Sequence, residues 1–221
     1  MPMTSVFVAM LAAYAWGSLS PTNFVARWRK GIDLRYYGSG NVGGMNLGVL
    51  LGKRWAVAIG ALDWAKGLLP ALVARLAGAD GTSVVLISLA TVVGHDWSLY
   101  LDFKGGRGVA ATIGLLFAWD LRLALLFLAI IAIGWIVNQG APSCLIALML
   151  LAPVAWLVAA PMEIVWGSVT LLVITLIKRL EANRLPLPSD AREKRLVLLR
   201  RLWLDRDIAS DREWQERGEI K

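Results

Sequence analysis

The chain has 221 residues, of which 57% are hydrophobic and 18% are charged, and its mean hydropathy is +0.61. A water-soluble domain of this size cannot bury so much apolar surface, which excludes a soluble globular fold. The apolar residues fall into stretches of about 17 to 24 residues, and at about 1.5 Å rise per residue these match a hydrocarbon core about 30 Å thick. The composition therefore predicts an all-α, polytopic integral membrane helix bundle.

Seven stretches are expected to span the membrane. In chain order they are residues 5–26, 55–78, 82–100, 109–119, 121–137, 143–160 and 162–177. The fourth is short and reaches the length of a span only if residues 105–108 enter the membrane region. The first is expected to be a retained span and not a signal peptide, because no basic region precedes it while Arg27, Arg29 and Lys30 follow it.

Most lysines and arginines lie in three regions of the chain, which are residues 27–54, the loop around residues 104–107, and the tail after residue 177. With seven spans, all three regions fall on the same side of the membrane. Basic loops are retained in the cytoplasm, so the N-terminus is predicted outside and the C-terminus inside. The net charge of +7 is explained by this topology, and no stacking platform or recognition motif indicates that the chain binds nucleic acid.

Residues 186–221 are predicted to form a basic cytoplasmic tail on a transmembrane domain of residues 1–185. Asp190 and Glu193 are spaced as a helix-capping pair, and apolar residues including Leu196 and Trp203 follow among arginines. This pattern favours an amphipathic helix, over about residues 189–217, that lies on anionic lipid. A solvated helix packed on the loops is nearly as well supported.

Few residues can supply catalytic or metal chemistry. The single cysteine, Cys144, is predicted to be a small core residue, so no disulfide forms within the chain. The single histidine, His95, excludes a histidine-based metal site and is the only candidate imidazole base, although a structural role fits it equally well. Asp63 and Lys66 are predicted to form an ion pair in lipid, with a functional role as the alternative. No metal or cofactor is expected.

Two predicted cytoplasmic loops are rich in glycine. The first, residues 37–46, reads Tyr-Gly-Ser-Gly-Asn-Val-Gly-Gly-Met-Asn, and the second, residues 103–108, reads Phe-Lys-Gly-Gly-Arg-Gly. Glycines allow successive backbone N–H groups to turn inward into an anion-binding concavity. Lys104 and Arg107 add two cations, while Ser39, Asn41 and Asn46 can donate hydrogen bonds. The loops therefore favour phosphate binding, with close helix packing and tight turns as the alternative.

In these residues the chain resembles the bacterial acyl-phosphate-dependent glycerol-3-phosphate acyltransferases, the PlsY family. The similar segments are residues 38–43 with Asn46 and Gly52, residues 63–67, and Gly94 and His95 with residues 103–110. Together with the pattern of spans, the resemblance covers about residues 1–185. Its most specific part is the second glycine loop.

The resemblance implies transfer of a fatty acyl group from acyl phosphate to the 1-hydroxyl of sn-glycerol 3-phosphate. The products would be lysophosphatidic acid and inorganic phosphate, formed at the cytoplasmic face of the cell membrane. Catalytic roles are implied for Ser39, His95 and Lys104, the last stabilising the leaving phosphate and the developing oxyanion. The hydroxyl proton would pass to His95 or to a substrate phosphate oxygen. The expected partners are the two substrates and membrane lipids, without a cofactor.

The resemblance also assigns substrate-binding residues. The phosphate groups would be bound by Gly38, Gly40, Asn41, Asn46, Gly105, Gly106, Arg107 and Gly108, and the acceptor site would contain Ser143, Lys178 and Arg179. Four positions depart from the family pattern. Met45 and Val49 stand where threonine and arginine are usual, and Lys178 and Glu181 stand where histidine and asparagine are usual. The alternative function is therefore a non-catalytic membrane paralogue that binds acyl phosphate or phospholipid and regulates lipid synthesis.

Overall fold

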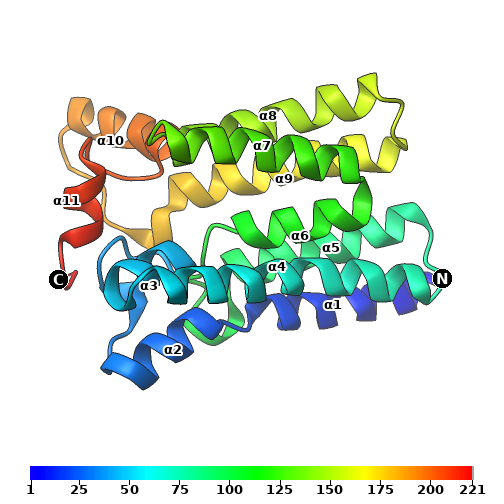
Figure 1. Ribbon diagram of the computed structural model, residues 1–221, viewed down its shortest axis with the longest axis horizontal. Coiled ribbons are helices and arrows are strands. Elements are labelled where there is room, and N and C mark those ends of the chain that lie inside the picture. The colour runs from blue at the N-terminus through cyan, green and yellow to red at the C-terminus, as the bar shows by residue number, and fades with distance from the viewer. Residues whose placement is uncertain (221) are drawn as a thin grey trace.

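The computed structural model describes residues 1–220, which form helices joined by short connections (Figure 1). The α-helices are α1 (Met3–Ser18), α2 (Pro21–Lys30), α3 (Gly44–Leu51), α4 (Lys53–Leu76), α5 (Gly81–Asp96), α6 (Val109–Trp119), α7 (Leu121–Ile136), α8 (Gly140–Leu157), α9 (Met162–Glu181), α10 (Ala191–Leu204) and α11 (Asp211–Glu216). Three short 3-10 helices are η1 (Leu34–Tyr36), η2 (Leu99–Leu101) and η3 (Ala182–Arg184). The prediction of an all-α fold is confirmed.

The apolar helices lie side by side in two groups (Figure 1). One group contains α1, α4, α5 and α6, in which α1 packs on α5 and α4 packs on α6. The other contains α7, α8 and α9, and contacts between α5 and α9 join the two groups. The remaining helices, α2, α3, α10 and α11, gather at one end of the bundle. That end also holds both glycine-rich loops.

Small residues allow the paired helices to approach closely. A side chain at Gly67 of α4 would overlap the carbonyl of Ala111 in α6, and one at Gly94 of α5 would overlap the carbonyl of Tyr14 in α1. Glycine at such contacts is typical of helices that associate in lipid, where packing replaces the hydrophobic driving force. The glycines thus bring α4 close to the start of α6 and the end of α5 close to α1.

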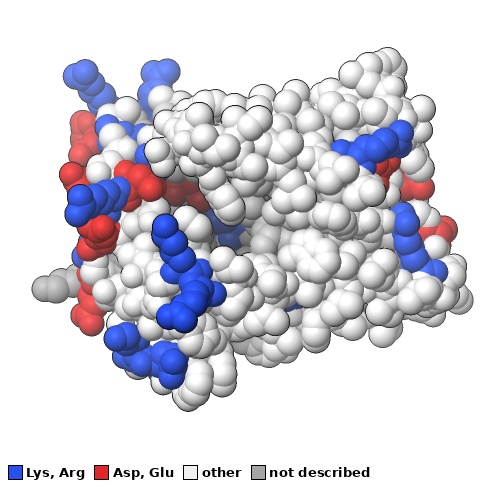
Figure 2. Space-filling model, in the orientation of Figure 1, with Lys and Arg blue, Asp and Glu red and all other residues white. Residues whose placement is uncertain are grey.

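Four stretches are long and apolar enough to cross a membrane. They are Met3–Lys30, which includes α1 and α2, Lys53–Leu76, Gly81–Leu101 and Gly140–Leu157. The apolar helices Val109–Trp119 and Leu121–Ile136 are shorter. In Figure 2 the charged side chains gather at the two ends of the molecule and leave an uncharged band between them. These features are those of an integral membrane protein.

The first predicted span, residues 5–26, is interrupted in the structure. Helix α1 ends at Ser18, Leu19 is extended, and Pro21 begins α2. Proline lacks the N–H group that would continue the helix but is well suited to the first helical position. The Ser20 hydroxyl caps α2 by accepting a hydrogen bond from the Asn23 N–H at 3.3 Å. The carbonyl of Leu19, released by the break, accepts a hydrogen bond from Lys66 Nζ at 2.9 Å.

The tail forms two helices, where the sequence predicted one over about residues 189–217. The predicted capping pair is present, since the Glu193 N–H donates to Asp190 Oδ1 at 2.8 Å. Helix α10 then packs on α8 and α9 and ends at Leu204, followed by Asp205 in the left-handed conformation. The tail therefore lies against the end of the bundle and returns over the first glycine loop, where Tyr37 and Glu219 form an isolated β-bridge.

Candidate active site

Asn46 organises the first glycine-rich loop, which leads from η1 into α3. Its Nδ2 donates hydrogen bonds to the carbonyls of Tyr37 at 2.9 Å and Asn41 at 3.0 Å, and its Oδ1 accepts from the Ser39 N–H at 3.4 Å. The Ser39 hydroxyl accepts from the Asn41 N–H at 3.3 Å. Asn46 is buried, so these contacts fix the loop from within. Three of the residues predicted to bind substrate therefore also hold one another in place.

The second glycine-rich loop folds back onto the end of α5. The N–H groups of Gly105 and Gly106 donate to the carbonyls of Asp96 and His95, each at 3.0 Å. Gly106 lies directly against the His95 ring, where a side chain would overlap Nε2. Gly108, with φ of 65°, immediately precedes α6. The loop is thus bound closely to the only histidine in the chain.

The backbone N–H groups of four predicted phosphate-binding glycines have carbonyl partners in this conformation. Besides the two in the second loop, the Gly38 N–H donates to the Gly218 carbonyl at 2.7 Å and the Gly40 N–H to the Tyr37 carbonyl at 3.1 Å. The sequence predicted that such groups turn inward as an open anion cradle. Side chains are consequently the groups most available for an anion.

Asn183, which the sequence analysis missed, joins the two loops. Its Nδ2 donates to the carbonyls of Gly40 at 2.9 Å and Gly105 at 3.1 Å. The Val42 N–H adds a longer contact of 3.4 Å to the same Gly105 carbonyl. Asn183 is buried and has a φ of 55°, which asparagine tolerates better than most residues. The two loops, far apart in sequence, therefore form one surface.

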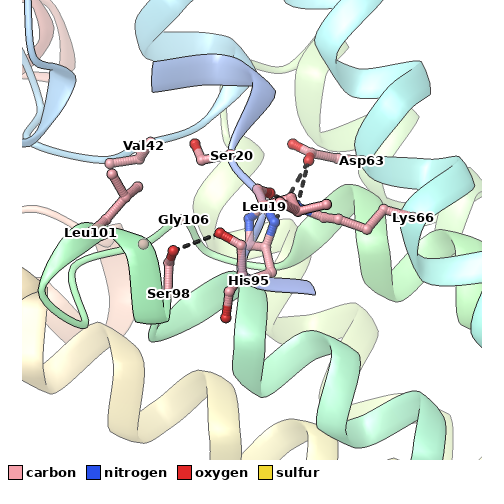
Figure 3. Close-up of a pocket in the computed structure, with 11 residues that line it drawn as sticks. Leu19, Ser20, Val42, Asp63, Lys66, His95, Ser98, Leu101 and Gly106 are labelled. Atoms are coloured by element: carbon pink, nitrogen blue, oxygen red, sulfur yellow. Dashed lines mark hydrogen bonds and ion pairs between the residues drawn. The ribbon is translucent and has the colours of Figure 1, made fainter. Parts of the chain in front are cut away.

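A buried charged cluster lies beside these loops (Figure 3). Lys66 Nζ is 3.0 Å from Asp63 Oδ1, which confirms the predicted ion pair. His95 Nδ1 lies 3.7 Å from the same oxygen, and Figure 3 shows the three side chains converging. Ser20, Ser98 and Gly106 line the adjoining cavity of about 10 Å³. Such a cavity has room for about one water molecule.

The two cations of the second loop have different surroundings. Lys104 forms no ion pair with any described residue, and its Nζ lies 5.1 Å from the centroid of the Tyr36 ring. Arg107 instead contacts the tail, with its Nε 2.7 Å from Asp205 Oδ1 and 2.9 Å from Asp205 Oδ2. Lys104 is therefore the cation that is free to meet a substrate phosphate without first leaving a carboxylate.

The three residues predicted for the acceptor site are buried, and each contacts a different part of the protein. Lys178 Nζ is 3.0 Å from Glu181 Oε2. Arg179 donates to the carbonyls of Ala141 and Leu202, each at 2.7 Å, and so joins α8 to α10. Ser143 lies against Gly134 of α7. None of these three residues lines the cavity beside His95.

Two positions that depart from the family pattern face outward. Met45 is 60% exposed and Val49 is 46% exposed, both on α3. Asp96, a further residue that the sequence analysis missed, is fully buried next to His95, and neither of its carboxylate oxygens has a hydrogen-bond partner among residues 1–220. The charges of Lys178 and Arg107 act on it. In the sequence, only its position next to His95 could have marked Asp96 as a candidate site residue.

The fold and the site define an all-helical integral membrane protein that carries a polar, glycine-lined site at one end of its bundle. Residues 7–185 match the protein family described as glycerol-3-phosphate acyltransferase. A relative from Dehalococcoides mccartyi (strain CBDB1), named glycerol-3-phosphate acyltransferase 4, is 32% identical over 223 residues, which cover 98% of this chain and 96% of the relative. That similarity extends into the tail.

Two solved structures are similar to this chain. The crystal structure of PlsY, described as an integral membrane glycerol 3-phosphate acyltransferase, in its glycerol 3-phosphate form has a TM-score of 0.73 and 29% identity, covering 79% of this chain and 88% of that one. The lysophosphatidic acid form has a TM-score of 0.71 and 26% identity, covering 80% and 89%. The chain belongs to the glycerol-3-phosphate acyltransferase family, PlsY. Its function is accordingly the acylation of glycerol 3-phosphate to lysophosphatidic acid in phospholipid synthesis.

Proposed function

We propose that this chain uses acyl phosphate as its donor and acylates the 1-hydroxyl of sn-glycerol 3-phosphate without a cofactor. The observation that carries this proposal is that Asn183 joins the two glycine-rich loops. The second of these loops packs on His95 and carries Lys104, which forms no ion pair with residues 1–220. Both expected substrates carry phosphate, and glycine-rich loops of this kind can form anion-binding concavities, so two adjoining loops suit a pair of phosphate-bearing substrates.

In the proposed reaction the glycerol oxygen forms a bond to the acyl carbonyl carbon, and the bond from that carbon to the phosphate oxygen breaks. Lys104 stabilises the negative charge on the leaving phosphate, and the Ser39 hydroxyl donates a hydrogen bond to a substrate oxygen. The hydroxyl proton passes to His95 or to a phosphate oxygen of the substrate. Holding the two substrates side by side supplies much of the rate enhancement, so no covalent intermediate with the protein is required.

The further site assignments are part of the same proposal. The phosphate groups contact the loop residues Gly38, Gly40, Asn41, Asn46, Gly105, Gly106, Arg107 and Gly108, and the acceptor site includes Ser143, Lys178 and Arg179. The N–H groups that now contact carbonyls would have to exchange partners before binding an anion. Lys104, which forms no ion pair with any of residues 1–220, needs no such rearrangement, which is why it carries the greatest weight among the residues assigned.

We further propose that α1 and α4 to α9 are the seven spans, with residues 1–185 as the membrane domain and residues 186–221 as the tail. The site end of the bundle then faces the cytoplasm of a plasma membrane, and the N-terminus lies outside. The band of uncharged surface in Figure 2 supports placing the long axis of the bundle along the membrane normal. Single cysteines at Asp102 and Arg212, both highly exposed, are expected to react with an impermeant maleimide only from the cytoplasmic side. Reaction of either position from the outside would contradict the proposed topology.

Activity is tested with purified protein in phospholipid nanodiscs, palmitoyl phosphate and glycerol 3-phosphate. Phosphate release that requires glycerol 3-phosphate, with lysophosphatidic acid detected by mass spectrometry, is the expected result. Lys104→Ala should lower kcat at least about 100-fold, in the range seen when a charge-stabilising group is removed. Lys53→Ala, which removes an exposed lysine of α4, should leave the rate unchanged. Equal rates for wild type and Lys104→Ala would contradict the proposed role.

A further inference from the structure

The tail presents a carboxylate to the second glycine-rich loop. Asp205 approaches the Nε edge of Arg107 with both oxygens, at 2.7 and 2.9 Å, and the two side chains are 19% and 10% exposed. The contact joins residues that are 98 positions apart. An exposed ion pair contributes little, but a partly buried pair with good geometry can fix the orientation of an arginine. The tail therefore sets where the Arg107 guanidinium points.

A buried arginine anchors the turn after α10, in which Asp205 lies. Arg201, only 2% exposed, donates to both oxygens of Asp207, at 2.7 and 2.9 Å, and to the carbonyls of Leu180 at 3.1 Å and Leu185 at 3.0 Å. This network ties the turn after α10 to the end of α9. The turn that carries Asp205, whose own N–H donates to the Arg201 carbonyl at 3.1 Å, is thus attached to the membrane domain through a buried arginine.

The Nη edge of the Arg107 guanidinium, opposite the Asp205 contact, forms no hydrogen bond with residues 1–220. Its Nη1 is buried, yet it has no hydrogen-bond partner among residues 1–220. Both oxygens of the neighbouring Asp96 are also without a donor in that part of the chain, so the two groups do not satisfy each other. A buried guanidinium N–H without an acceptor is costly and calls for an anion or water. The side-by-side N–H groups of arginine suit the oxygens of a phosphate.

The tail also contacts the first loop. Arg217 Nε donates to the Gly38 carbonyl at 2.6 Å, and the Ile220 N–H donates to the Tyr36 carbonyl at 2.8 Å. Figure 1 shows the end of the chain lying beside α3, in agreement with these contacts. Residues after the last apolar helix therefore contact both loops of the site, and are part of its construction.

We propose that Asp205 is a positioning residue, which holds Arg107 by its Nε edge so that its free Nη edge binds a phosphate of the substrate. The inference rests on the proposed function for its substrate, but its subject is anion binding by Arg107. If the Asp205 carboxylate instead occupied the phosphate position, it would compete with substrate. Removing its charge should raise the Kd for phosphate if Asp205 positions Arg107, and should lower that Kd if Asp205 competes with phosphate.

The test combines turnover with direct binding of inorganic phosphate to the full-length protein in nanodiscs, measured by isothermal titration calorimetry. Asp205→Asn is expected to raise the Kd for phosphate and the KM for glycerol 3-phosphate or palmitoyl phosphate by about tenfold, within the range of measured couplings between contacting residues. The kcat should change less than about twofold. Asp205→Glu should recover part of the loss. Glu216→Gln, which removes one carboxylate of an exposed ion pair with Arg212, is the matched control and should behave as wild type.

A double-mutant cycle separates positioning from a general structural role. If Asp205 acts through Arg107, adding Asp205→Asn to Arg107→Ala should cause no further change in Kd. An unchanged Kd in Asp205→Asn, a lower Kd, or losses that add in the double variant would each overturn the inference, as would a wild-type protein that binds no phosphate in the millimolar range. A wild type that binds phosphate through both residues but performs no acyl transfer would instead sink the proposed function and leave the inference standing.

Discussion

The side-chain amide of Asn183 donates a hydrogen bond of 3.1 Å to the carbonyl oxygen of Gly105, although 78 residues separate the two in the chain. The same amide reaches the Gly40 carbonyl at 2.9 Å. One buried side chain thus bonds to both glycine-rich loops and, with the Val42 N–H, helps to set the distance between them. A reaction between two phosphate-bearing substrates depends on that distance, because misplacement of the reacting atoms by about 1 Å can cost about 100-fold in rate.

Replacing Asn183 with glycine should separate the loops without straining the backbone. Glycine accepts the φ of 55° at this position, so the change removes only the amide. Two buried carbonyls lose a donor, and we expect a loss of about 1–3 kcal/mol in the free energy of unfolding and at least about a tenfold fall in kcat/KM. Both are measured in detergent micelles by thermal unfolding and phosphate release.

The control for this prediction is Asn138→Gly. Asn138 has nearly the same φ, 56°, but is exposed in the connection between α7 and α8. That variant should retain wild-type activity. If the two glycine variants behave alike, the amide of Asn183 does not determine the geometry of the loops.

The sequence was sufficient to predict the apolar helices and much of the candidate site. Hydropathy is a local property, so the stretches at residues 55–78 and 109–119 correspond closely to α4 and α6. Glycine-rich loops and a lone histidine are equally visible in one sequence. Asn183, which joins the two loops, was missed because its position depends on a backbone conformation that no local sequence pattern predicts. Ala182, Asn183 and Arg184 all have positive φ, at 45°, 55° and 62°, which is rare for residues other than glycine.

The tail shows the same limit. Its capping pair and first helix follow from the sequence, but the meeting of Asp205 with Arg107 depends on how α10 packs on α8 and α9. That packing rests on Arg179 and Arg201, whose charges indicated membrane topology in the sequence but whose guanidinium groups bind backbone carbonyls in the structure. Buried arginines with carbonyl partners cannot be distinguished from cytoplasmic surface charge by composition.

Gly106→Ala should abolish most activity. A methyl group at this position would overlap Nε2 of the His95 ring, and the ring, enclosed between α4, α5 and the loop, has little room to turn away. We expect at least about a tenfold loss of phosphate release, since the second loop must move from the end of α5. Gly60→Ala is the control, because a side chain there meets no atom within 4 Å. It should leave activity unchanged and slightly stabilise α4. Full activity in Gly106→Ala would show that this close contact is dispensable.

Lys66→Met should destabilise the protein more than removal of both charges of its pair. The single change leaves the buried carboxylate of Asp63 without its partner at 3.0 Å and also frees the Leu19 carbonyl. Breaking a buried pair in this way costs about 3–5 kcal/mol. In Asp63→Asn/Lys66→Met no charge remains to be compensated, so part of the loss should be regained. Thermal unfolding in micelles gives the order of stability, and a double variant less stable than Lys66→Met would refute the assignment of a mainly structural pair.

The contribution of Asp33 to stability should disappear in acid. Burial raises the pKa of this carboxyl group, but hydrogen bonds from Arg35 and Arg27 outweigh that effect and hold the pKa below its usual range. The contacts from Arg27 and Arg35 to Asp33 Oδ2 measure 2.5 and 2.8 Å, and Arg35 continues to Asp102 at 2.6 Å, which connects the segment before the first loop to the segment before the second.

Because the pKa of Asp33 is lower in the folded protein than the usual value of about 3.9, the folded state binds its proton less readily. The stabilisation is therefore fully present above about pH 4 to 5 and is lost as the pH falls toward the folded pKa. Asp33→Asn should lower the Tm at neutral pH, and the difference from wild type should shrink on acidification below about pH 4. Glu216→Gln, which alters an exposed pair, should show little difference at any pH. A gap between wild type and Asp33→Asn that stays constant or widens in acid would mean that the carboxylate does not stabilise this segment through its arginines.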